Sequence, residues 1–228
     1  TPARTPWWLL ILRLAIAALV ITALAHPLLN PQALLTGSGP LVLVIDDGWA
    51  AAPRWPERLA AMSELTDRAE RNGLPVRLLA TAPRADGQPI AVSDVLTAAE
   101  ARSIVQAMTP RPWPTDRGAA LAALAQLAPD VSGGMNALWL TDGLASAQAD
   151  VDNQLAKRLQ ELGDLTVLRD PPEDMALLMM PPSGSQSGLT LTVRRPAGDH
   201  VRTVTVRATG EQGELVAREE IGFNVGET

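Results

Sequence analysis

The sequence predicts an α/β protein with a doubly wound, mainly parallel sheet, preceded by a transmembrane helix and followed by a small antiparallel β domain. Three observations lead to this prediction. A long apolar run opens the chain, short apolar runs then alternate with amphipathic segments, and a strict apolar–polar alternation follows Pro171-Pro172. The chain has 228 residues, 46% of them hydrophobic, which is enough for one medium domain and a smaller piece.

The apolar run at residues 7–29 is predicted to be the transmembrane helix. As a helix it would rise about 34 Å, enough to cross a hydrocarbon layer of about 30 Å. Trp7 and Trp8 stand where an interfacial aromatic belt belongs, and Arg13 is the only ion inside the run. The membrane bilayer is therefore the first expected partner.

The positive charges predict the orientation of this helix. Arg4 and Arg13 lie at its N-terminal side, and the next positive side chain is Arg54. This asymmetry places the N-terminus in the cytoplasm and the soluble part in the periplasm of a bacterial inner membrane. The alternative is a signal peptide with an Ala23-Leu24-Ala25 cleavage site, which would also export the domain.

The predicted domain boundaries follow changes in composition. Proline, glycine and serine mark a linker, strands and helices alternate after it, and period-two alternation marks the last part. The chain is thus divided into a transmembrane helix at 1–30, a linker at 31–40, an α/β domain at 41–172 and a β-sandwich-like accessory domain at 173–228.

Each element of the α/β domain has its own signal. Short apolar runs predict the strands, and apolar residues at helical spacing predict the helices, one of them opened by the capping box Thr97-Ala98-Ala99-Glu100. The strands are expected at 41–45, 76–80, 137–140 and 165–168, and the helices at 55–71, 97–108, 116–128 and 151–162. In the last domain, alternation at 189–193, 204–208 and 221–225 predicts antiparallel strands.

Two carboxylates follow buried strands. Asp46 ends the first apolar run and Asp142 follows the run at 137–140. The carboxyl ends of parallel strands meet at one edge of a sheet, so both side chains are expected there, within reach of Thr115 at the start of a helix. Carboxylate and hydroxyl oxygens are the ligands that Mg²⁺ prefers.

Here the sequence resembles a von Willebrand factor A domain over about residues 40–170. The metal-ion-dependent adhesion site of that family uses Asp-x-Ser-x-Ser, a later Thr, and the Asp of Thr-Asp-Gly. Asp46, Thr115 and Asp142 match the first Asp, the Thr and the last Asp, whereas Gly48 and Ala50 replace the two serines. The resemblance thus implies a degenerate metal site, and no cofactor is expected other than weakly bound Mg²⁺.

The opening run gives a second resemblance. It begins Pro-Trp-Trp-Leu-Leu, ends Ala-His-Pro-Leu-Leu-Asn-Pro and leads into the first strand, which is similar to BatA-type aerotolerance membrane proteins. The resemblance implies an envelope assembly or stress role linked to MoxR-type ATPases, with related Bat-type proteins as partners. It also implies a further membrane helix before Thr1.

The composition and the absence of certain motifs argue against several classes of function. A net charge of −6 argues against nucleic acid as a partner, and the absence of cysteine excludes thiolate chemistry. No nucleophile elbow or phosphate loop is present, so neither an enzyme nor a small-molecule substrate is expected.

The prediction is a membrane-anchored, non-catalytic interaction module, with Trp49 and Trp113 as candidate partner contacts at the sheet edge. Two alternatives stay open. One is a working Mg²⁺-dependent adhesion module. The other is a phosphatase of the haloacid dehalogenase type, since Asp46-Asp47-Gly48 ends a strand as the nucleophile motif of that family does, although Gly48 stands where its second Asp belongs.

Overall fold

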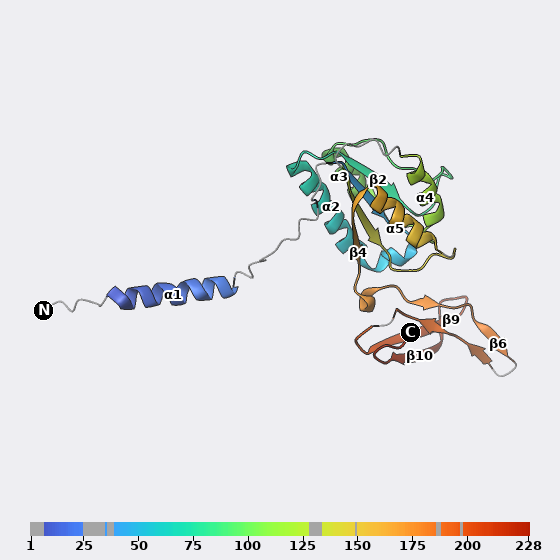
Figure 1. Ribbon diagram of the computed structural model, residues 1–228. Helices are drawn as coiled ribbons and strands as arrows, with labels where there is room; N and C mark the ends of the chain where they lie inside the picture. The colour runs from blue at the N-terminus through green and yellow to red at the C-terminus, as the bar shows by residue number, and fades with distance from the viewer. Residues whose placement is uncertain are drawn as a thin grey trace. The chain divides into compact units, whose positions relative to one another are not determined.

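The computed structural model describes residues 7–24, 35, 39–127, 134–148, 150–185, 188–196 and 198–228 (Figure 1). The chain divides into two compact units, one up to residue 34 and one from residue 35 to the end. Each unit is described by itself below.

The first unit contains helix α1 (Trp7–Leu24), and the prediction of a transmembrane helix is wrong for the described residues. No helix among them is long and apolar enough to cross a membrane. Helix α1 has 18 residues. Residues 25–29 of the predicted span, and Arg4, lie outside the described part of the chain.

The second unit is built on a parallel four-stranded sheet with the order β2-β1-β3-β4. The strands are β1 (Leu41–Ile45), β2 (Val76–Ala80), β3 (Met135–Thr141) and β4 (Gly163–Arg169). The two central strands, β1 and β3, are buried along their whole length, which explains their continuous apolar runs. The edge strand β4 is half-exposed and correspondingly more polar.

Within the described residues, four α-helices and a short 3₁₀ helix connect the strands. They are η1 (Trp49–Arg54), α2 (Trp55–Arg71), α3 (Ala98–Ala107), α4 (Arg117–Ala125) and α5 (Val151–Leu162). Helix α2 packs with α3, and α4 with α5 (Figure 1). The α4–α5 pair shares a buried apolar cluster with one face of the sheet, including Val42, Val44 and Trp139.

Local sequence determines where the helices begin. Thr97 accepts a hydrogen bond from the backbone of Glu100, whose side chain accepts one from the backbone of Thr97, so the predicted capping box opens α3. Asp116 caps α4 by accepting a hydrogen bond from the Ala119 N–H at 2.8 Å. This cap places the next residue, Arg117, at the start of the helix and beside the sheet edge.

The last part of the chain forms three small antiparallel sheets of two strands each within the described residues. Strand β5 (Leu178–Met179) pairs with β8 (Val193–Arg194), β6 (Ser183–Ser185) with β7 (Gly188–Thr190), and β9 (Arg202–Thr209) with β10 (Leu215–Phe223). A 3₁₀ turn, η2 (Pro172–Asp174), precedes them. The fold is therefore mixed α/β with one parallel sheet and small antiparallel sheets, and not the membrane-spanning arrangement predicted.

Candidate functional site

The carboxyl ends of β1 and β3 bring Asp46 and Asp142 together, as their sequence positions predict. Both are buried, with 0% and 4% of their surfaces exposed. The backbone N–H of Asp46 donates to the carbonyl of Leu140 at 3.0 Å, and the N–H of Asp142 donates to Oδ2 of Asp46 at 3.1 Å. The two strand ends are thus joined by the first carboxylate.

The cation between these carboxylates is the guanidinium of Arg117. Its Nη2 lies 2.7 Å from Oδ2 of Asp46 and 2.6 Å from Oδ1 of Asp142. Its Nη1 lies 2.9 Å from Oδ1 of Asp152, at the start of α5. Only 1% of the Arg117 side chain is exposed. A single buried cation therefore connects the ends of two strands with the starts of two helices.

The remaining contacts of Arg117 leave none of its nitrogens free. Nε donates to Oδ2 of Asp46 at 3.3 Å, Nη1 to the carbonyl of Leu144 at 2.6 Å and Nη2 to Oγ1 of Thr141 at 3.3 Å. The guanidinium also lies 5.2 Å from the ring centroid of Trp139, within cation–π distance. This cluster of Arg117, Asp46, Asp142 and Asp152 is called the arginine cluster below.

Asp46 is also held by neutral donors. Its Oδ1 accepts from the hydroxyl of Thr81 at 2.6 Å and its Oδ2 from the indole N–H of Trp139 at 3.2 Å. Oδ1 of Asp142 accepts from the backbone N–H of Leu144 at 3.0 Å. Both carboxylates thus stabilise the carboxyl edge of the sheet by accepting hydrogen bonds from neighbouring donors.

These residues do not fit a divalent metal ion. The space between the carboxylates is taken by the guanidinium, whereas Mg²⁺ requires near-octahedral oxygen ligands at about 2.0–2.1 Å. A Cβ at Gly48 would lie 3.0 Å from the carbonyl oxygen of Trp113 and 3.1 Å from Thr115, so the loop has closed over the place of a serine. Within the described residues, no hydrogen bond joins Thr115 to either carboxylate.

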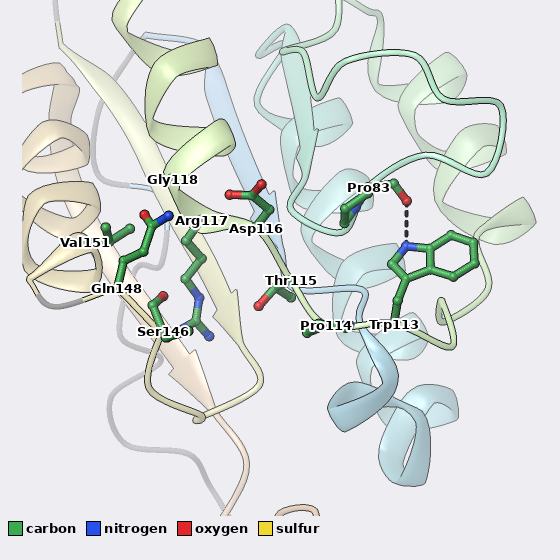
Figure 2. A pocket seen from close by; sticks show the side chains of 11 residues that line it. Pro83, Trp113, Pro114, Thr115, Asp116, Arg117, Gly118, Ser146, Gln148 and Val151 are labelled. Atoms are coloured by element: carbon green, nitrogen blue, oxygen red, sulfur yellow. Dashed lines mark hydrogen bonds between the residues drawn. The ribbon is translucent and has the colours of Figure 1, made fainter.

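Thr115 instead lines a pocket of about 360 Å³ beside the arginine cluster, called the rim pocket here (Figure 2). Trp113 lies at one end, where its indole N–H donates to the carbonyl of Pro83 at 2.7 Å, and Gln148 and Val151 lie at the other (Figure 2). Of the two tryptophans proposed as partner contacts, Trp113 thus lines this pocket. Trp49, half-buried at the start of η1, is not part of its lining.

Burial, neighbouring charges and hydrogen bonds together shift the pKa values of the groups in the arginine cluster. Burial and then the negative charge of Asp46 raise the pKa of Asp142, and Arg117 offsets this only in part. Burial also opposes ionisation of Asp152, but hydrogen bonds from Ser146 and Arg117 outweigh it and lower its pKa. Burial works against the charge of Arg117, yet the surrounding carboxylates raise its pKa.

Sequence reasoning missed Arg117 and Asp152. A signal for Arg117 was present, because a cation at the first position of a helix is disfavoured by the helix dipole. Such a residue needs compensation nearby, and buried acidic groups at the ends of β1 and β3 supply it. Asp152 carried no comparable signal, since an acidic residue in the first turn of a helix is ordinary.

In structure, the chain is similar to an aerotolerance-related membrane protein. That protein, from Bacteroides fragilis NCTC 9343, is 20% identical over 69% of this chain and 82% of its own, with a TM-score of 0.44. Proximal thread matrix protein 1 from the mussel byssus is 17% identical over 59% of this chain and 37% of its own, with a TM-score of 0.42.

The pilus adhesin SpaC from Lactobacillus rhamnosus GG is 19% identical over 46% of this chain and 15% of its own, with a TM-score of 0.37. No protein-family model matches the sequence, and no curated protein matches it significantly. The similarities are distant, so the roles of individual residues rest on the geometry of the arginine cluster and the rim pocket.

Replacing Arg117 by alanine should destabilise the fold strongly. The change removes the cation that contacts both Asp46 and Asp142, and breaking a buried pair in this way costs about 3–5 kcal/mol of unfolding free energy. Chemical denaturation at neutral pH measures this. Arg68→Ala is the matched control, because it breaks an exposed pair with Glu64, which is worth at most about 1 kcal/mol. Equal losses in the two variants would contradict the role given to Arg117.

The raised pKa of Asp142 predicts a pH dependence. The folded state keeps the proton of Asp142 to higher pH than the unfolded chain, whose pKa is near 3.8. Wild type should therefore lose stability relative to Asp142→Asn as pH rises from about 4 through the raised pKa, and then stay level. Denaturation of both proteins across this range tests it.

Comparison with Asp86→Asn should give the opposite pH dependence of stability, because Arg84 lowers the pKa of the exposed Asp86 to about 2. Wild type should gain stability relative to this variant as pH rises from about 2 to about 4. A wild-type protein that gains stability relative to Asp142→Asn above pH 4 would show that Arg117 overcompensates the burial of Asp142.

Proposed function

We propose that this chain is a non-catalytic protein-interaction module whose binding edge needs no metal ion. The observation that carries the proposal is the guanidinium of Arg117, which lies between Asp46 and Asp142 at hydrogen-bond distance from both. A guanidinium stays charged at any physiological pH and cannot dissociate from the chain. The geometry of this edge is therefore independent of the metal supply.

The burial of Asp46 favours this proposal over a phosphatase. A nucleophilic carboxylate needs an oxygen that can reach the substrate. Asp46 is 0% exposed, and both of its oxygens accept hydrogen bonds. In addition, Gly48 offers no side chain where the second acid of such an enzyme would stand.

The contacts of Arg117 favour the proposal over a metal-dependent adhesion module. In such a module, an acidic group of the partner would complete the shell of the ion. Here Arg117 already binds Asp46, Asp142 and Asp152 and the carbonyl of Leu144. It has no donor left for a carboxylate of the partner, so recognition falls to the neighbouring surface.

The rim pocket is the part of that surface best suited to a protein segment. Trp113 and Pro114 give it an apolar wall, and Ser146 and Gln148 add polar groups at the opposite side (Figure 2). Its volume of about 360 Å³ suits an inserted apolar side chain better than a large cofactor. Tryptophans at such positions often supply much of the binding energy of an interface.

The proposed setting is the bacterial envelope, with the second unit in the periplasm and related Bat-type proteins and a MoxR-type ATPase system as partners. The resemblance of the opening run to BatA-type proteins supports this setting. So does α1, whose Trp7, Trp8 and Ile11 side chains are exposed by 77%, 56% and 52% and offer apolar surface for contact.

A photo-crosslinking experiment tests the function. A benzophenone amino acid at Ala147, in the rim pocket, should give a discrete adduct with a partner protein in the native cell extract. The yield should be the same in EDTA and in Mg²⁺, and Trp113→Ala should lower it about tenfold or more, as for an interface hot spot.

Trp49→Ala is the matched control in this experiment, because it removes a tryptophan outside the rim pocket and should leave the adduct. An adduct that EDTA abolishes would favour the metal-dependent alternative. An adduct unaffected by Trp113→Ala would show that the partner docks elsewhere.

A reporter fusion tests the proposed location. Alkaline phosphatase, which folds only after export because it needs disulfides, should be active when fused after Thr228. A green fluorescent protein at the same position should stay dark. A bright fluorescent fusion with an inactive phosphatase would place the module in the cytoplasm.

A further inference from the structure

A second cavity, of about 670 Å³, lies at the outer edge of β2. It is bounded by the sheet edge, by the loop between Pro83 and Leu96 and by the end of α3, and is called the edge cavity here. Its apolar lining includes Ile45, Val92, Ile104 and Met108. Its volume falls in the range of about 300–1,000 Å³ that is usual for ligand sites.

Only part of the outer edge of β2 is paired. Val76 and Leu96 exchange backbone hydrogen bonds at 2.9 and 2.8 Å. At Leu78, the carbonyl accepts from the N–H of Ser93 at 2.9 Å, and the N–H donates to Oγ of Ser93 at 2.9 Å. Alternate residues of β2 thus present their backbone groups outward, and the 93–96 segment covers the first two of them.

Ala80 is the next residue in this series. The N–H of Thr81 donates inward to the carbonyl of Ile45 at 3.0 Å, so the N–H and C=O of Ala80 point away from β1. Ala80 lines the edge cavity, and within the described residues neither backbone group has a hydrogen-bond partner. A donor and an acceptor at a sheet edge are the groups with which an added strand pairs.

Asp47 adds a carboxylate to the lining of the edge cavity. Its side chain is only 3% exposed and lines the edge cavity. Oδ1 accepts from the N–H of Ala82 at 2.8 Å, but the nearest cation to Oδ2 is Nε of Arg111 at 3.9 Å, beyond hydrogen-bond distance. Burial raises the pKa of Asp47, and the backbone N–H groups of Ala82 and Asp47 together with the charge of Arg111 offset this only in part. A cationic donor entering the cavity would relieve this cost.

We propose that the edge cavity binds an extended peptide segment of a partner protein. The peptide backbone pairs with the N–H and C=O of Ala80, an aliphatic side chain enters the cavity, and a neighbouring lysine or arginine donates to Oδ2 of Asp47. An extended peptide meets all these requirements at once, since its side chains alternate in direction while its backbone groups face the strand. This site is separate from the rim pocket.

Peptide selection tests the proposal. Random linear heptapeptides displayed on phage are selected on the 228-residue chain, and the enriched peptides are synthesised. They should combine aliphatic with basic residues and slow the hydrogen exchange of the Ala80 amide. Ala80→Pro should weaken their binding about tenfold or more, the equivalent of one or two hydrogen bonds. The proline removes no bond to β1, because the N–H of Ala80 faces outward.

Ala85→Pro is the matched control. Ala85 is exposed and is the second residue of the turn in which the N–H of Gly87 donates to the carbonyl of Arg84 at 3.1 Å, a position that favours proline. Binding to this variant should be unchanged. Should Ala80→Pro fail to fold, Ile104→Asp on α3 and Asp47→Asn test the apolar lining and the carboxylate, and each should weaken binding.

Three results would overturn the proposal: no enrichment on the wild-type chain, peptides that bind Ala80→Pro or its two substitutes as tightly as wild type, or unchanged exchange of the Ala80 amide in the complex. Enrichment of acidic peptides that depend on Arg111 would overturn the assignment of a basic segment.

Discussion

The second unit depends on the ion pairs that Arg117 makes in its interior. Asp46 follows β1 and Asp142 follows β3. Asp152 lies in the first turn of α5, and Arg117 begins α4. A cation at the start of a helix opposes the helix dipole, and burying it costs more. Buried carboxylates without a cation are equally unfavourable. The cation and the carboxylates therefore offset each other's cost of burial. The four elements are held in one arrangement because removing any one of these charges would leave the others uncompensated.

A guanidinium and a metal ion can both join carboxylates, but they have different consequences for binding. A metal ion can keep an open position, so a partner can become its ligand. The planar guanidinium has a fixed set of donors, and here the protein uses them on Asp46, Asp142, Asp152 and nearby oxygens. The cluster is thus closed to a partner. What it provides is a rigid base for the rim pocket, whose Trp113 and Gln148 stand on loops beside it (Figure 2).

Sequence patterns predicted the positions of Asp46 and Asp142 because strand burial and strand direction are local properties with a simple geometric result. They did not predict Arg117, which lies 71 positions from Asp46 along the chain and meets it only in the folded structure. Thr115 was placed near the edge, but its role was not foreseeable, because it depends on how the loop at Gly48 closes. The N-terminal apolar run correctly indicated a helix, α1, but no helix of the described residues meets the length and apolarity that a membrane span requires.

The two adjacent residues that follow β1, Asp46 and Asp47, differ in how many hydrogen bonds their carboxylates accept from the protein. Asp46 and Asp47 are both buried, and strand alternation directs their side chains to opposite faces. Asp46 meets Arg117, Thr81 and Trp139 on one face. Asp47 accepts hydrogen bonds from the backbone N–H groups of Ala82 and of Asp47 itself, and Nε of Arg111 lies 3.9 Å from its Oδ2. Both oxygens of Asp46 accept hydrogen bonds from within the protein. Asp47 lines the edge cavity together with Ala80, and this is where we place the proposed peptide.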